Sequence, residues 1–151
     1  ERLNRWNCAY SLFKERPVFG WGPGTYQFVY APYQEAKYQT IISTNNADGG
    51  NAHSEYLGPL AEQGFLGPIF MLILLWYLCV LGFRLWNEVT NIETRNLAVS
   101  VYLGLMTYFI HGILNNYLDT DKASAPFWGF IALLVVLDIE LREKQKEITT
   151  F

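Results

Sequence analysis

One apolar stretch in the middle of the chain limits its possible folds more than any other feature. Residues 65–83 form an unbroken run of 19 residues without a charged side chain. A helix needs about 20 apolar residues to cross the hydrocarbon core of a bilayer. The run is also too long and too uniformly apolar for an ordinary core helix of a soluble domain. It therefore predicts a transmembrane helix and excludes a soluble helical domain.

Two further stretches lack charged side chains. Residues 97–114 form the longer one, and His111 lies within it. Residues 123–137 form the shorter one, which crosses a membrane only with the help of flanking residues. We predict an all-α integral membrane chain with transmembrane helices at 65–85, 97–114 and 125–139.

Basic residues divide unequally among the loops that join these spans. Five follow the first or the third span: Arg84, Arg95, Arg142, Lys144 and Lys146. Only Lys122 lies between the second and third spans. Because Lys and Arg accumulate on the cytoplasmic side, the loop 86–96 and the tail 140–151 are predicted to be cytoplasmic. Residues 1–64 and 115–124 then face the periplasm or exterior.

The periplasmic region 1–64 is predicted to contain short helices. Apolar residues recur at steps of three and four, at Leu3, Trp6, Tyr10 and Phe13, which predicts an amphipathic helix over residues 2–15. Its stripe faces either protein or the membrane surface. Pro17 ends this helix, because the residue before a proline is disfavoured in the α region. A second helix is predicted to begin near residue 52 or 53 and to run to residue 63.

Charge and cysteine content exclude several classes of protein. The net charge of −3 provides no basic field for nucleic acid. Cys8 and Cys79 lie in different environments, so a disulfide is not expected, and no spacing of Cys and His suggests zinc. The chain begins at Glu1 without an initiator methionine or a signal sequence, which suggests a fragment of a longer protein.

Four short motifs follow one another before the first span. They are Arg2 with Leu3 and Trp6, then RPVFGWGPGTY at 16–26, NAHSEYL at 51–57 and AEQGFLG at 61–67. Their order and spacing resemble the O-antigen ligase/polymerase superfamily of bacterial envelope glycan enzymes. Ser54 departs from the family pattern, in which Asn commonly follows the histidine. It keeps a small hydrogen-bonding side chain.

The resemblance implies that the chain is the C-terminal part of a larger polytopic glycosyltransferase of the bacterial inner (cytoplasmic) membrane. Such an enzyme transfers a glycan from an undecaprenyl diphosphate carrier to a hydroxyl of a glycan, of the lipid A-core or of a protein, without metal or cofactor. By motif, His53 corresponds to the catalytic histidine and Arg2 to an arginine that binds the diphosphate. A second family arginine is expected upstream of this chain.

The chemistry of these residue types agrees with those roles. A guanidinium binds phosphate oxygens through two parallel hydrogen bonds, and a diphosphate can leave without a protonating acid. Histidine is the side chain whose ordinary pKa suits a general base near neutral pH. Arg5 and Arg16 are alternatives to Arg2.

Further candidates for supporting roles are Glu55, Arg16, His111 and Asn115. Glu55 either orients the imidazole or stabilises a helix N-terminus, and the spacing predicts that Glu55 and Glu62 share one helix face. His111 and Asn115 either line an interior cavity or make hydrogen bonds at a helix end.

Three alternatives compete with this interpretation. Gly20, Gly22 and Gly24 do not form a dinucleotide fingerprint, because Pro23 interrupts them; a tight turn is favoured. Asp119 and Asp121 are interpreted as helix-end charges rather than metal ligands. The alternative function is a non-catalytic membrane component that translocates or guides lipid-linked glycan. It predicts polar residues along the spans, which these spans almost lack.

Overall fold

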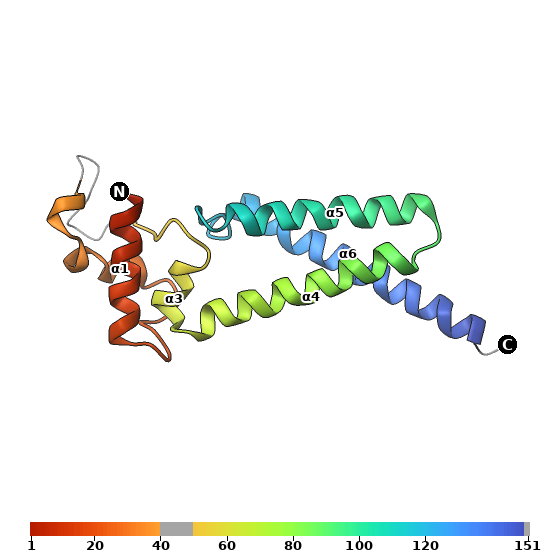
Figure 1. The fold of residues 1–151 in the computed structure, drawn as a ribbon, viewed down its shortest axis with the longest axis horizontal. Coiled ribbons are helices and arrows are strands. Elements are labelled where there is room, and N and C mark those ends of the chain that lie inside the picture. The colour runs from red at the N-terminus through yellow and green to blue at the C-terminus, as the bar shows by residue number, and fades with distance from the viewer. Residues whose placement is uncertain (40–49, 150–151) are drawn as a thin grey trace. The chain divides into compact units, whose positions relative to one another are not determined.

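The computed structural model describes residues 1–39 and 50–149, and every regular element in these ranges is a helix (Figure 1). The elements are α1 (Arg2–Glu15), α2 (Tyr26–Val29), the 3-10 helices η1 (Ala31–Tyr33) and η2 (Ala36–Tyr38), α3 (Leu57–Gln63), α4 (Leu66–Glu88), α5 (Ile92–His111) and α6 (Asp121–Thr149). The predicted all-α class is confirmed for this part of the chain. The chain divides into two compact units. We call them the loop unit (Glu1–Leu72 and His111–Leu118) and the long-helix unit (Ile73–Ile110 and Asp119–Phe151).

Helix α1 occupies the residues that the sequence predicts, but its buried face is a different one. The helix ends at Glu15, because Arg16 before Pro17 leaves the α region with φ −133° and ψ 71°. The side chains of Leu3 and Tyr10, in the predicted apolar stripe, are 62% and 52% exposed. The buried residues are instead Asn4, Arg5, Cys8, Ala9 and Leu12. The apolar stripe therefore faces away from the core of the loop unit.

The core of the loop unit combines small and aromatic side chains. Its buried residues are Cys8, Ala9, Leu12, Tyr26, Tyr30, Ala52 and Ala61. Helix α1 packs on α3, and small residues on both helices allow the two backbones to approach closely (Figure 1). The rings of Tyr26 and Tyr30 stack with centroids 5.3 Å apart. This core fixes the first turns of α1 relative to the segment that precedes α3.

Helix α3 begins at Leu57, several residues later than predicted. Two side-chain hydrogen bonds explain the delay. Asn51 Oδ1 accepts the His53 backbone N–H at 3.1 Å, and His53 takes a left-handed φ of 50°. Ser54 Oγ then accepts the N–H of Leu57 at 3.3 Å, which starts the helix. Glu55 consequently lies before the helix, so the predicted shared helix face with Glu62 is wrong.

Helices α4 and α6 are long and apolar enough to cross a membrane. Only 22% of the apolar window in α4 and 17% of that in α6 is buried, unlike a core helix of a soluble protein. The predicted spans 65–85 and 125–139 largely coincide with α4 and with the middle of α6. The predicted cytoplasmic tail continues the helix to Thr149.

Helix α5 differs from the predicted span 97–114. It begins at Ile92 and includes Glu93 and Arg95, and it ends at His111. Part of its length is therefore polar, and residues 112–114 of the uncharged run are not helical. Because of its polar residues α5 is not apolar enough to qualify, and the described residues contain two candidate membrane-spanning helices where the sequence predicts three.

Aromatic contacts and one ionic cluster hold the long-helix unit together. A Cβ added to Gly82 of α4 would lie 2.4 Å from the Tyr102 ring of α5, so the glycine allows close packing. The Phe127 ring of α6 lies 4.4 Å from that of Tyr108. Arg84 of α4 reaches the buried carboxylate of Asp138 in α6 at 3.0 Å. The three long helices therefore pack on one another.

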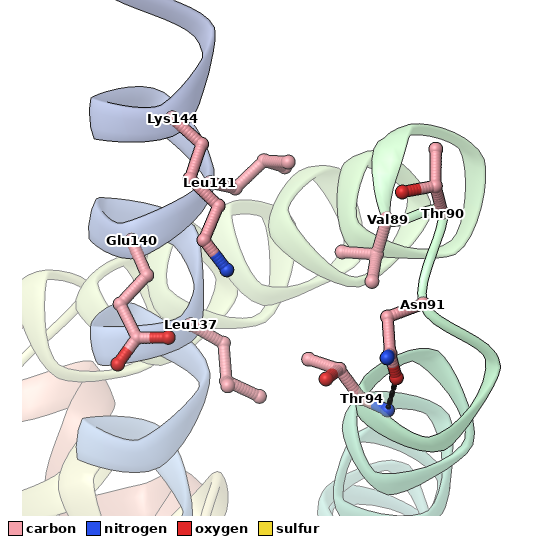
Figure 2. A pocket seen from close by; sticks show the side chains of 8 residues that line it. All are labelled: Val89, Thr90, Asn91, Thr94, Leu137, Glu140, Leu141 and Lys144. Carbon is pink, nitrogen blue, oxygen red and sulfur yellow. Dashed lines mark hydrogen bonds between the residues drawn. The ribbon is translucent and has the colours of Figure 1, made fainter. Parts of the chain in front are cut away.

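A shallow pocket of the long-helix unit lies between the α4–α5 turn and α6 (Figure 2). Its lining residues are Val89, Thr90, Asn91, Thr94, Leu137, Glu140, Leu141 and Lys144. The cavity volume of about 70 Å³ has room for a few water molecules rather than a sugar. Asn91 Oδ1 already accepts the Thr94 N–H at 3.0 Å. None of the predicted site residues lines this pocket.

Candidate functional site

The motif stretches that flank residues 40–49 meet at the C-terminal end of α3. The Trp21 N–H donates to the Ala61 carbonyl at 3.2 Å, and the Gly22 N–H donates to the Glu62 carbonyl at 2.7 Å. The Phe65 N–H donates to the Pro17 carbonyl at 2.9 Å. Backbone hydrogen bonds thus join stretches that are about 40 residues apart in sequence.

The carboxylate of Glu62 closes the turn between Gly24 and Tyr26. Its Oε2 accepts the Gly24 N–H and its Oε1 accepts the Tyr26 N–H, each at 2.9 Å. These two donors have no helical partner at the start of α2, and an ionised acceptor strengthens both bonds. The sequence placed Glu62 on a helix face without predicting this role. Its position in the AE-x-G motif was the available signal.

Substitution Glu62→Gln is expected to destabilise the loop unit by about 1–3 kcal/mol, because one backbone N–H then faces an NH₂ group instead of an oxygen. The thermal unfolding midpoint of the full-length protein in detergent measures the effect. Glu143→Gln, at an exposed position of α6, is the matched control and is expected to leave the midpoint unchanged. Equal midpoints for the two variants would contradict the role of Glu62.

The tight turn predicted for residues 20–24 is confirmed, and it lies against α3. Gly20, Gly22 and Gly24 all have positive φ values, of 64°, 111° and 74°. A Cβ on Gly20 would lie 2.3 Å from the carbonyl carbon of Glu62. Arg16, at the end of α1, stacks over the Trp21 ring with 4.0 Å between its Cζ and the centroid. It thereby covers this turn.

His53 lies in a bend of the chain before α3 and is half-buried. Its positive φ is unusual for a residue with a side chain, and the Asn51 hydrogen bond supports it. Burial lowers the pKa of the imidazole below its ordinary value of 6.5. The positive charges of Arg5 and then Arg2 lower the pKa further, while Glu1 opposes them. The imidazole of His53 is therefore neutral at pH 7.

Both arginines belong to the first turns of α1. Arg2 is exposed, whereas Arg5 is only 7% exposed. The two charges act on His53, so the fold brings together the histidine and two of the three arginines that the sequence offers. Arg16 lies at the other end of α1, about 20 Å away for a helix of 14 residues. We therefore place Arg16 with the glycine turn and not with His53.

Glu55 connects the His53 segment to residues 111–118. Its Oε1 accepts the Leu118 N–H at 2.7 Å and also the Tyr117 N–H. The Glu55 backbone N–H donates to the Gly112 carbonyl at 2.8 Å. The side chain is buried, at 4% exposure. These contacts give Glu55 a role that the sequence did not predict, namely holding the chain after α5 beside the segment that carries His53.

His111 and Asn115 lie at the end of α5. The His111 side chain is exposed, and its backbone carbonyl accepts the Leu114 N–H at 3.0 Å and the Asn115 side-chain amide at 3.4 Å. Of the two predicted alternatives, this contact supports hydrogen bonding at the helix end for Asn115. Asn116 follows Asn115 in the chain. Its Oδ1 is buried without a hydrogen-bond partner in the described part of the chain.

Fold and site together define a class: a helical protein with two candidate membrane-spanning helices, α4 and α6, and a neutral histidine beside two arginines. Residues 1–72 match a family model described as O-Antigen ligase, and they include all four motifs. The first 72 residues are thus similar to this family, which confirms the resemblance. No curated protein and no solved structure matches the chain.

The family match has consequences at a general level. The O-antigen ligase family points to glycan ligase or polymerase activity, with a lipid-linked glycan and an acceptor as partners. Together with α4 and α6, the match indicates a membrane protein.

Proposed function

We propose that this protein transfers a glycan from an undecaprenyl diphosphate carrier to an acceptor hydroxyl on the periplasmic side of the bacterial inner membrane. The observation that carries the proposal is the position of His53. It lies within the matched family segment, and burial and two neighbouring arginines keep its imidazole neutral. A neutral imidazole accepts a proton, and the nearby cations suit an anionic donor.

In the proposed reaction His53 accepts the proton of the acceptor hydroxyl as its oxygen attacks the anomeric carbon of the donor. The bond between that carbon and the diphosphate oxygen breaks, its electron pair leaves with the lipid diphosphate, and the anomeric configuration inverts. Arg2 neutralises the charge that develops on the leaving group. Its exposed guanidinium is accessible to a ligand, whereas that of Arg5 is buried.

Contacts of Glu55 support the proposed orientation of the chain. They join residues of the 1–64 segment to the 111–118 segment, which supports the proposal that both lie on one side of the membrane. The chain leaves the loop unit along α4 and returns to it at the end of α5. If α4 crosses the membrane, α5 must cross back, which we propose despite its polar first turns. We propose spans at 65–85, at 97–111 within α5 and at 125–139, with 86–96 and 140–151 in the cytoplasm.

Complementation with the full-length protein tests this function. It is expressed in a strain that lacks its own ligase or polymerase, and the envelope glycans are analysed by gel electrophoresis and mass spectrometry. Chain length and anchor then identify the acceptor. A protein that only translocates or guides lipid-linked glycan would tolerate loss of Arg2 and His53, so transfer by a doubly substituted protein at equal abundance would overturn the proposal.

Arg2→Gln is expected to lower transfer by about 100-fold, because a group that stabilises developing negative charge is removed. Arg2→Lys should restore part of the loss, since it keeps the charge but not the two-pronged geometry. Initial rates in nanodiscs with purified lipid-linked donor measure both variants. Lys37→Gln removes an exposed cation that is paired with Glu35 at 2.7 Å, and it serves as the control. Equal rates for Arg2→Gln and Lys37→Gln would refute the role of Arg2.

A further inference from the structure

Arg5 is an unusually enclosed cation for a helix of the periplasmic region. Its Nε binds Glu1 Oε1 at 3.0 Å, and its Cζ lies 4.3 Å from the centroid of the fully buried Tyr30 ring. The Tyr26 hydroxyl donates to the Arg5 carbonyl at 2.8 Å. A buried guanidinium is costly unless its donors are satisfied. Its Nη1 nevertheless has no hydrogen-bond partner among the described residues. Helix propensity alone does not explain this arrangement.

Gly50 lies directly against the Arg5 guanidinium. A Cβ added to Gly50 would lie 1.8 Å from Arg5 Nη1 and 2.6 Å from the Tyr30 ring, so a side chain there would have to displace the guanidinium and the ring. Gly50 begins the described segment that carries His53 three residues later. Asn51, the next residue, accepts the His53 backbone N–H. The guanidinium of Arg5 thus contacts Gly50, and Gly50 directly precedes the residue that holds the His53 backbone. A shift of Arg5 is therefore coupled to the position of His53.

We propose that Arg5 is a positioning residue for His53. Its guanidinium, enclosed by the Tyr30 ring and the Gly50 backbone, fixes the start of the His53 segment and keeps a permanent positive charge beside the imidazole, which stays in its proton-accepting form. The inference rests on the proposed function, in which His53 is the base. The inference gives the two arginines different roles. Arg2 contacts the diphosphate of the donor, whereas Arg5 acts on the reaction through His53.

The electrostatic environment of His53 agrees with this division. Burial lowers the pKa of His53 most, and Arg5 is the charge with the largest effect, ahead of Arg2. Glu1 raises the pKa, but less than Arg5 lowers it. Further titratable groups of the surrounding segments are Tyr56, Glu55, whose carboxylate binds two backbone N–H groups, and the exposed His111. The positive charge of Arg5 is therefore not cancelled by its own ion pair with Glu1.

Residue-resolved chemical modification of His53 tests the inference without requiring catalysis. Diethyl pyrocarbonate reacts with neutral imidazole, and mass spectrometry of the His53 peptide gives its modification rate as a function of pH in the full-length protein. We expect Arg5→Gln to raise the pKa of His53 and Arg5→Lys to leave it near the wild-type value. Glu1→Gln should shift it in the opposite direction, downward. The acid limb of the activity profile should move with the measured pKa.

The outcomes separate a charge effect from a purely structural role. If Arg5 only supported the fold, Arg5→Gln would change the plateau rate of modification without moving the pKa, and this result would overturn the inference. An unchanged pKa in Glu1→Gln would do so as well, even if Arg5→Gln failed to fold. Because modification does not depend on turnover, the two proposals can fail separately. If the wild-type protein transfers no glycan but Arg5→Gln still raises the pKa of His53, the proposed function is contradicted and the role of Arg5 is not.

Gly50→Ala provides an independent geometric test. The added methyl group displaces the guanidinium, so the His53 pKa should rise as it does in Arg5→Gln. Gly104→Ala is the matched control, because a Cβ there has no heavy atom within 4 Å of it beyond its own helix. A His53 pKa that is equal in Gly50→Ala and Gly104→Ala would contradict the coupling between Gly50 and Arg5.

Discussion

His53→Gln is expected to lower glycan transfer by about 10²–10⁴-fold, the usual contribution of a positioned general base. Glutamine has a similar size and can keep a hydrogen bond, but it cannot accept the proton of the acceptor hydroxyl at neutral pH. The positive φ of His53 is unchanged by the substitution, so folding should be affected little. The loss should appear in kcat rather than in KM for the donor, because the proton is transferred in the chemical step.

Rates measured in nanodiscs at matched protein abundance test this expectation. The other described histidine, His111, is exposed at the end of α5, and His111→Gln should lose far less activity than His53→Gln. Similar losses in both variants would remove the distinction on which the assignment of the base depends. Wild-type rates in His53→Gln would refute the proposed mechanism.

The lowered pKa of His53 fixes the sign of the pH dependence. Activity should be constant around pH 7 and fall only as the pH drops below 6.5 through the pKa of the folded protein. The free energy of unfolding depends on pH in the same direction as the activity. Between the folded pKa and 6.5 the unfolded chain binds more protons than the folded one, so the unfolding free energy rises with pH in that window. His53→Gln should abolish both dependences.

Gly20→Ala is the substitution with the largest expected effect on folding. The new methyl group would lie 2.3 Å from the Glu62 carbonyl carbon and 2.4 Å from its oxygen, and φ of 64° adds strain. Backbone atoms of α3 cannot move aside without breaking the hydrogen bonds that join the two motif stretches. We expect a loss of at least about 4 kcal/mol, which is exceptional for one substitution, and unfolding of the loop unit.

Gly24→Ala separates this clash from backbone strain. Gly24 belongs to the same turn and has a φ of 74°, but a Cβ there has no heavy atom within 4 Å. It should cost only about 1–2 kcal/mol, the price of a left-handed residue with a side chain. Limited trypsinolysis of the full-length protein, monitored at Arg5 and Lys14, compares the two variants. Equal resistance to trypsin would contradict the close packing of the turn on α3.

The helices were predictable where one local pattern was strong. The uncharged run 65–83 predicted α4, and the apolar period with Pro17 gave the bounds of α1. The start of α3 was missed, because Asn51 and Ser54 bond to nearby backbone groups and delay the helix. The end of α5 was missed because lack of charge does not determine where a helix stops.

The buried face of α1 was not determined by the sequence, for a different reason. The hydrophobic period left open whether the apolar stripe faces protein or the membrane surface, and Leu3 and Tyr10 are exposed in the structure. Arg5 is buried in their place, and sequence reasoning considered it only as an alternative to Arg2. A charged residue is seldom enclosed in a core, so no pattern rule would have selected it. Its burial depends on Tyr30 and Gly50, which approach it only after folding.

The sequence by itself determined the helical class, the apolar stretches and the similarity to the family, because each depends on composition or on residues close together in the chain. It also singled out His53 and Arg2 through the motifs. Only the tertiary structure decided which charges act on His53, what Glu55 and Glu62 bind, and what a side chain at Gly20 or Gly50 would displace. These properties depend on contacts between segments far apart in the sequence, and such contacts form only when the loop unit packs around its core.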